Sequence, residues 1–160
     1  MKKVMIIGCP GGGKSTFAKR LHEKTGLPLY HLDNIWHRPD KTNISREEFD
    51  IALQHILGED AWILDGNYGR TLEMRMQACD TVFLLDLPLE VCLAGAAARV
   101  GKKRDDLPWV EESFDPEFKE WILGFHEKEL PHVYELLRKY SHKNIIIFRS
   151  REEIDAYQIL

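Results

Sequence analysis

The chain has 160 residues, of which 44% are hydrophobic, and its formal net charge is −4 at pH 7. This length and apolar content suit one buried core, so we expect residues 1–160 to form a single domain. The acidic balance argues against broad contact with nucleic acid, although a local basic cluster leaves such contact open. No apolar stretch is long enough to span a membrane, so no membrane partner is expected.

The strand-like and helix-like segments alternate along the chain. The strand-like segments are short apolar runs, which are typical of strands buried on both faces of a parallel sheet. This alternation predicts an α/β fold. Strands are expected at residues 4–7, 29–32, 62–64, 82–85 and 145–148. The first helix is expected to follow the first loop and to end at Gly26. Further helices are expected at 45–57, at 88–99 and from 115 through about 125. Another is expected to reach about residue 140, and a final one begins at 150.

The first loop matches the phosphate-binding pattern G-x-x-x-x-G-K-[ST] between an expected strand and an expected helix. Glycines let backbone N–H groups surround an anionic oxygen, and the helix that follows directs its positive end at the same phosphate. Lys14 is expected to reach the β- and γ-phosphates, and Ser15 to offer its hydroxyl to Mg²⁺. The expected nucleotide-binding residues here are Gly8, Pro10, Gly11, Gly12, Gly13, Lys14, Ser15 and Thr16.

Further candidates follow the other expected strands, because ligands of open parallel sheets bind at the carboxyl ends of the strands. Asp65 is expected to hold Mg²⁺ through water, with a backbone-bonded turn aspartate as the alternative. Asp33 is expected to orient or deprotonate the phosphoryl acceptor, although Asp33-Asn34 is also an ordinary turn pair. Arg70 is expected to contribute to nucleotide binding.

Two more segments near these strand ends have competing interpretations. Trp36, His37 and Arg38 could line an acceptor pocket, while Trp36 suits core packing equally well. Asp86 also ends a strand, but Pro88 two residues later favours helix capping.

The densest basic cluster comprises Arg99, Lys102, Lys103 and Arg104, within a segment of about 99–116 that we expect to act as a lid. Phosphoryl transfer spreads negative charge over the γ-phosphoryl oxygens, and Arg99 and Arg104 are the expected catalytic cations because guanidinium binds phosphate bidentately. The alternative is a solvated helix end, where cations are favoured anyway.

Metal-ligand spacing is missing from the cysteines and histidines. Cys9, Cys79 and Cys92 are an odd number and are expected to be reduced thiols, which predicts a cytoplasmic protein. The seven histidines lack H-E-x-x-H spacing, so His31, His37 and the others are expected to be surface or packing residues.

With these residues in place, the chain resembles adenylate-kinase-like and shikimate-kinase-like P-loop kinases. The likeness is carried by residues 65–71, which read Asp-Gly-Asn-Tyr-Gly-Arg-Thr, and by Asp86-Leu87-Pro88. Nearly the whole length is similar to the small bacterial DNA topology modulation proteins, through residues 32–36, 65–68 and 104–107. The resemblance implies a three-layer P-loop NTPase fold with a five-stranded parallel sheet in the order 2-3-1-4-5 and a small lid.

Two functions therefore remain open. The first is an ATP-dependent, Mg²⁺-dependent phosphotransferase, in which Lys14, Asp33, Arg99 and Arg104 act on a small acceptor such as a nucleoside or nucleotide. The alternative is a nucleotide-binding regulatory protein that modulates DNA topology or gene expression. Release of ADP that depends on a small acceptor would favour the first, and salt-dependent binding of DNA would favour the second.

Overall fold

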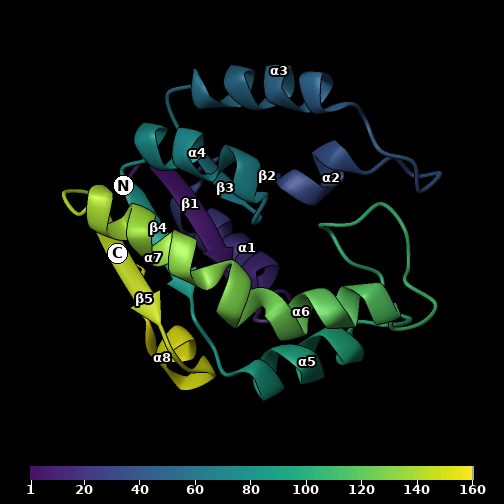
Figure 1. Ribbon diagram of the computed structural model, residues 1–160. Helices are drawn as coiled ribbons and strands as arrows, with labels where there is room; N and C mark the ends of the chain where they lie inside the picture. The colour runs from purple at the N-terminus through teal and green to yellow at the C-terminus, as the bar shows by residue number, and fades with distance from the viewer. Residues whose placement is uncertain (160) are drawn as a thin grey trace.

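The structure is a computed structural model that describes residues 1–159, and its centre is a five-stranded, wholly parallel sheet (Figure 1). The strand order is β2-β3-β1-β4-β5, which confirms the predicted α/β architecture and strand order. The strands are β1 (Lys3–Gly8), β2 (Leu29–His31), β3 (Trp62–Asp65), β4 (Thr81–Leu85) and β5 (Asn144–Phe148).

Helices surround the sheet. They are α1 (Lys14–Thr25), α2 (Leu32–Trp36), α3 (Arg46–Leu57), α4 (Leu72–Ala78), α5 (Leu89–Ala98), α6 (Pro116–Lys128), α7 (Leu130–Lys139) and α8 (Arg151–Ala156), with a 3₁₀ turn, η1, at Gly69–Thr71. Figure 1 shows α4 and α7 on one side of β1 and α1 on the other. Within residues 1–159 no helix combines the length and apolar character that crossing a membrane requires.

The core lies between the sheet and these helices. The run Val4–Ile7 in β1 is completely buried, as a central strand of a parallel sheet requires. Phe17 of α1 packs edge-on against Phe83 of β4 and Phe148 of β5, with ring centroids 4.8 and 5.4 Å away. These contacts fix the start of α1, and therefore the loop before it, against the middle of β4 and the end of β5.

Predicted helix starts are confirmed at three positions. Ser45 accepts a hydrogen bond from the Glu48 amide, and the Glu48 side chain bonds back to the Ser45 amide, which completes a capping box. Asp115 and Ser150 likewise cap α6 and α8 through their side chains. The local sequence predicts these helix starts because a cap involves residues only a few positions apart.

Three details differ from the expectation. Leu32 begins α2 instead of ending β2, so Asp33 lies in a short helix that follows the strand directly. The helix α4 was not predicted, because the fully buried Arg75 interrupts its apolar face. Asp86 does not cap α5: its carboxylate accepts hydrogen bonds from Tyr134 Oη (2.5 Å) and Arg149 Nη1 (3.1 Å).

Candidate functional site

The carboxyl ends of the parallel strands open into one large pocket of about 1250 Å³, which we call the strand-end pocket. Its walls come from the loop after β1, from α2, from residues 65–70, from the end of α5, from residues 103–106, and from α6 and α7. This volume exceeds the usual range for a site that holds one small ligand, and it offers room for two substrates.

The loop between β1 and α1 has the backbone that its glycines permit. Gly11 and Gly13 have φ angles of 82° and 97°, in the left-handed region that favours glycine. A Cβ on Gly11 would lie 2.0 Å from the Cys92 carbonyl oxygen of α5, so this position also needs the smallest residue for packing. Pro10, Gly11, Gly13, Lys14, Ser15 and Thr16 line the pocket, whereas Gly8 and Gly12 are buried in support of the loop.

Lys14 lies at the start of α1 with its Nζ 3.4 Å from the Cys9 carbonyl oxygen. Burial lowers the pKa of Lys14 from its ordinary value, while the charges of Asp65 and Asp33 act in the opposite direction. A cation held at a positive helix end without a close carboxylate partner suits an anionic ligand.

Ser15, Asp65 and His31 form a hydrogen-bonded chain beside the loop. Asp65 Oδ2 accepts from Ser15 Oγ and contacts His31 Nδ1, both at 2.8 Å, and the Asp65 side chain is 4% exposed. Burial alone would lower the pKa of His31, but the hydrogen bond and charge of Asp65 raise it above its ordinary value. The sequence indicated Ser15 and Asp65, but it gave His31 only a surface or packing role.

Residues after Asp65 are held rigidly against the loop. The Asn67 side chain accepts from the Gly8 amide (3.1 Å) and donates to the Gly8 carbonyl (2.8 Å), as a neighbouring strand would. The buried Arg75 donates to the backbone carbonyls of Gly66, Asn67 and Tyr68. Neither role was predicted, since each depends on contacts that only the folded chain makes.

Asp33 faces the same pocket from α2. Its Oδ1 accepts a 2.6 Å hydrogen bond from Tyr68 Oη. Tyr68 has a φ of 39°, a left-handed conformation that costs free energy in a non-glycine residue and is more frequent at functional sites. Trp36 both lines the pocket and packs edge-on against Phe49 and Tyr68, and its contact with an acceptor remains a prediction.

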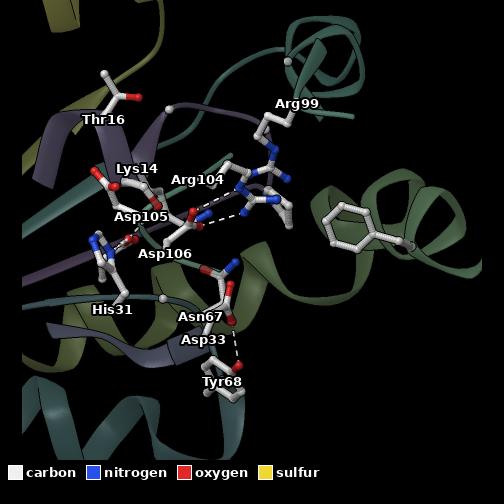
Figure 2. A pocket seen from close by; sticks show the side chains of 18 of the residues that line it. Lys14, Thr16, His31, Asp33, Asn67, Tyr68, Arg99, Arg104, Asp105 and Asp106 are labelled. Atoms are coloured by element: carbon white, nitrogen blue, oxygen red, sulfur yellow. Dashed lines mark hydrogen bonds and ion pairs between the residues drawn. The ribbon is translucent and has the colours of Figure 1, made fainter. Parts of the chain in front are cut away.

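Arg99 and Arg104 bring their guanidinium groups close together at the pocket edge (Figure 2). Arg104 donates to both carboxylate oxygens of Asp106, at 3.0 and 2.7 Å, and also pairs with Glu111. Within residues 1–159 the buried Nε of Arg99 has no hydrogen-bond partner. Arg99, which lines the pocket, therefore keeps an unused donor, while Arg104 is already neutralised by two carboxylates.

The segment carrying Arg104 lies over α1 and α2. Asp105 pairs with Lys19 at 3.1 Å, and its backbone carbonyl accepts a 2.6 Å hydrogen bond from Asn34. Trp109 packs edge-on against His37, with ring centroids 5.1 Å apart. These contacts hold part of the segment 99–116 across the pocket.

Arg70 lines the pocket but is engaged elsewhere. Its Nη1 and Nη2 donate to the two carboxylate oxygens of Asp50 on α3, at 2.9 and 2.7 Å. Both prongs of the guanidinium fork are used, and the nucleotide contact expected for Arg70 remains a prediction.

A magnesium site can be tested against the residues present. Within the described part of the chain, no group of three or more His, Cys, Asp or Glu side chains is arranged to hold a metal ion. Magnesium bound to phosphates takes only one or two protein ligands and keeps several waters. The 2.8 Å pair of Ser15 Oγ and buried Asp65 Oδ2, beside the phosphate loop, fits that requirement.

Comparison with known proteins gives a partial likeness. No protein-family model matches the chain. Adenylate kinases of Thermotoga neapolitana, Thermotoga petrophila and Thermotoga maritima are each 28% identical over 88 residues, which is 54% of this chain and 39% of each relative. The matched region thus spans about two fifths of the curated relatives. Together with the sheet order and the loop, this weak homology supports a P-loop kinase-like relationship.

Proposed function

We propose that this protein is an ATP-binding, Mg²⁺-dependent phosphotransferase that acts on a small hydroxyl-bearing acceptor. The observation that carries the proposal is the grouping of Lys14 with the bonded pair Ser15 and Asp65 in a pocket that extends to Asp33. The identity with adenylate kinases supports chemistry at a nucleotide phosphate. This combination provides for phosphate binding, metal positioning and acceptor contact in one continuous space.

The phosphate end would work through the loop backbone and Lys14. Amides from Gly11 to Ser15 lie at the positive end of α1 and would bind the β-phosphate, while Lys14 would leave the Cys9 carbonyl for phosphate oxygens. Ser15 and Asp65 would hold Mg²⁺ directly and through water, and bound Mg²⁺ supplies charge neutralisation between the β- and γ-phosphates. His31 would keep the Asp65 carboxylate in place.

Asp33 would address the acceptor. Tyr68 occupies Oδ1, so an acceptor hydroxyl would approach Oδ2 and give up its proton to it as the new oxygen–phosphorus bond forms and the bond between the γ-phosphorus and ADP breaks. The Tyr68 hydrogen bond fixes the orientation of the carboxylate. Such fixation matters because a misplaced base loses much of its rate advantage.

The two arginines would stabilise charge during transfer. Arg99 has an unpartnered buried donor, and burial lowers its pKa from the ordinary value. Donors directed at developing charge in a dry site contribute more to rate than to ground-state binding. Arg104 would add to this only after exchanging Asp106 or Glu111 for phosphate oxygens, since it is paired with both.

The test is ADP release from purified protein, with Mg²⁺-ATP and a panel of nucleosides, nucleotides and small hydroxylated metabolites. We expect one acceptor class to raise ADP release well above the ATP-only rate, and Lys14→Ala to abolish the increase while the protein stays folded. Lys24→Ala, at an exposed lysine near the other end of α1, is the matched control and should leave it unchanged. Acceptor-independent rates together with salt-dependent binding of DNA would instead support the regulatory function.

A further inference from the structure

One part of the strand-end pocket, lined from α2, residues 68–70 and α6, contributes a single arginine and no lysine. We call it the acceptor end and define it by six lining residues, Asp33, Trp36, Tyr68, Arg70, Trp121 and Glu129. Two of these residues are acidic, and the one basic residue among them is bound to the carboxylate of Asp50. An acceptor phosphate placed here would meet more negative than positive charge.

Arg70 is the residue that would otherwise bind an acceptor phosphate. Its fork is filled by Asp50, in a pair whose two side chains are 44% and 30% exposed. Beside it, a carboxylate oxygen of Glu129 lies 3.6 Å from where a Cβ of Gly69 would be. Binding a phosphate would therefore require Arg70 to leave Asp50 while a second carboxylate stays nearby.

The loop end of the same pocket carries more cations, although Asp65, Asp105 and Asp106 line it as well. Its basic lining residues are Lys14, Lys19, Arg99, Lys103, Arg104 and Arg151. These cations come from the loop, α1, the segment after α5 and α8, which places them on the ATP side in the proposed function. Lys19 and Arg104 are paired with carboxylates, and the charge of Asp33 acts on both Arg99 and Arg104, so the cations are concentrated toward the loop but are not confined to it.

Aromatic rings form much of the acceptor end. Trp36 and Tyr68 line it from α2 and from the segment after β3, and Trp121 of α6 is 41% exposed at its edge. Flat rings of this kind stack well on planar ligands. Asp33, fixed by Tyr68, adds an acceptor for a ligand hydroxyl.

We propose that the phosphoryl acceptor is an uncharged compound that combines a planar ring with a hydroxyl group, the chemistry of a nucleoside, and not a nucleoside monophosphate. This inference rests on the proposed function, because only a phosphotransferase has a phosphoryl acceptor. The binding preference itself rests on the occupied fork of Arg70, the nearby carboxylate of Glu129 and the rings of the acceptor end.

The test measures binding of matched pairs that differ only in one phosphate: adenosine and AMP, guanosine and GMP, cytidine and CMP, thymidine and dTMP. Titrations are followed by calorimetry with a non-hydrolysable ATP analogue and Mg²⁺ filling the loop end. They are run near pH 8. We expect at least one nucleoside to bind about tenfold or more tightly than its monophosphate.

Two variants test whether the pairing of Arg70 with Asp50 causes the preference for the nucleoside. Asp50→Ala frees Arg70 and should strengthen monophosphate binding by about tenfold with little change for the nucleoside. Asp60→Ala removes an exposed carboxylate just before the amino end of β3 and should change neither. Tighter binding of monophosphates by the unaltered protein, or no nucleoside binding at all, would overturn the inference. Nucleoside binding without ADP release would contradict the proposed function alone, and turnover of monophosphates only would contradict this inference alone.

Discussion

The close packing of α5 against the phosphate loop predicts opposite effects for two glycine-to-alanine changes. A Cβ on Gly95 of α5 would lie 2.0 Å from the Gly11 carbonyl oxygen, whereas Cβ contacts below 3.0 Å are essentially never observed. Gly95→Ala must therefore displace the loop or the helix by roughly 1 Å. A Cβ on Gly124 of α6 would meet only the flexible Lys128 side chain at 3.3 Å, which makes it a matched control.

The magnitudes follow from packing and helix propensity. Overpacking costs about 1–3 kcal/mol, and alanine in a helix offsets about 1 kcal/mol of that relative to glycine. We therefore expect Gly95→Ala to lower the free energy of unfolding by about 0–2 kcal/mol, and Gly124→Ala to raise it by up to about 1 kcal/mol. For a chain of this size, 1 kcal/mol corresponds to a Tm change of about 2–4 °C.

The assay combines thermal unfolding with ATP binding by calorimetry. Displacing the loop by this much should weaken ATP binding by about tenfold or more in Gly95→Ala, while Gly124→Ala should bind ATP as the unaltered protein does. The reasoning is refuted if Gly95→Ala is as stable as Gly124→Ala and retains full ATP affinity.

Three further outcomes are expected. Asp65→Asn should lower kcat by about 10- to 100-fold and should lower ATP affinity less, and raised Mg²⁺ should restore part of the activity. An equal loss of activity at every Mg²⁺ concentration would indicate that Asp65 only stabilises a turn. Arg99→Ala should lower kcat by about 100-fold with nearly unchanged Tm, and Arg99→Lys should recover only part of the rate; unchanged turnover in both would mark a solvated helix end. Burial alone would raise the pKa of Asp106, but Arg104 holds it at about 2. Because this is below the ordinary value of 3.8, about 2 kcal/mol of stability present above pH 4 is lost as the pH falls toward 2. Urea unfolding should show a smaller loss over that range in Asp106→Asn, and an identical loss would contradict the pairing.

The parts of the site that could be predicted from the sequence depend on short-range order or on strand ends. The loop from Gly8 to Thr16 has fixed spacing, and a strand and a helix flank it as predicted. The meeting of Ser15 with Asp65 follows from two adjacent parallel strands that end at the same edge. Such features need no knowledge of distant side chains.

The parts that were missed depend on contacts between distant segments. His31 is 34 residues from Asp65, and its role arises only because β2 and β3 are neighbours. Asp86 has a proline two residues later, which favours capping, yet its partners are 48 and 63 residues away. No local pattern distinguishes such a carboxylate from a cap.

The most direct test of phosphotransfer is the movement of labelled phosphate. Protein is incubated with Mg²⁺ and ATP labelled at the γ-phosphate, with and without the acceptor that raises ADP release, and the products are separated. The account predicts label on the acceptor in a one-to-one ratio with ADP, and none with Lys14→Ala. Label released only as inorganic phosphate, at the same rate with or without any acceptor, would contradict it.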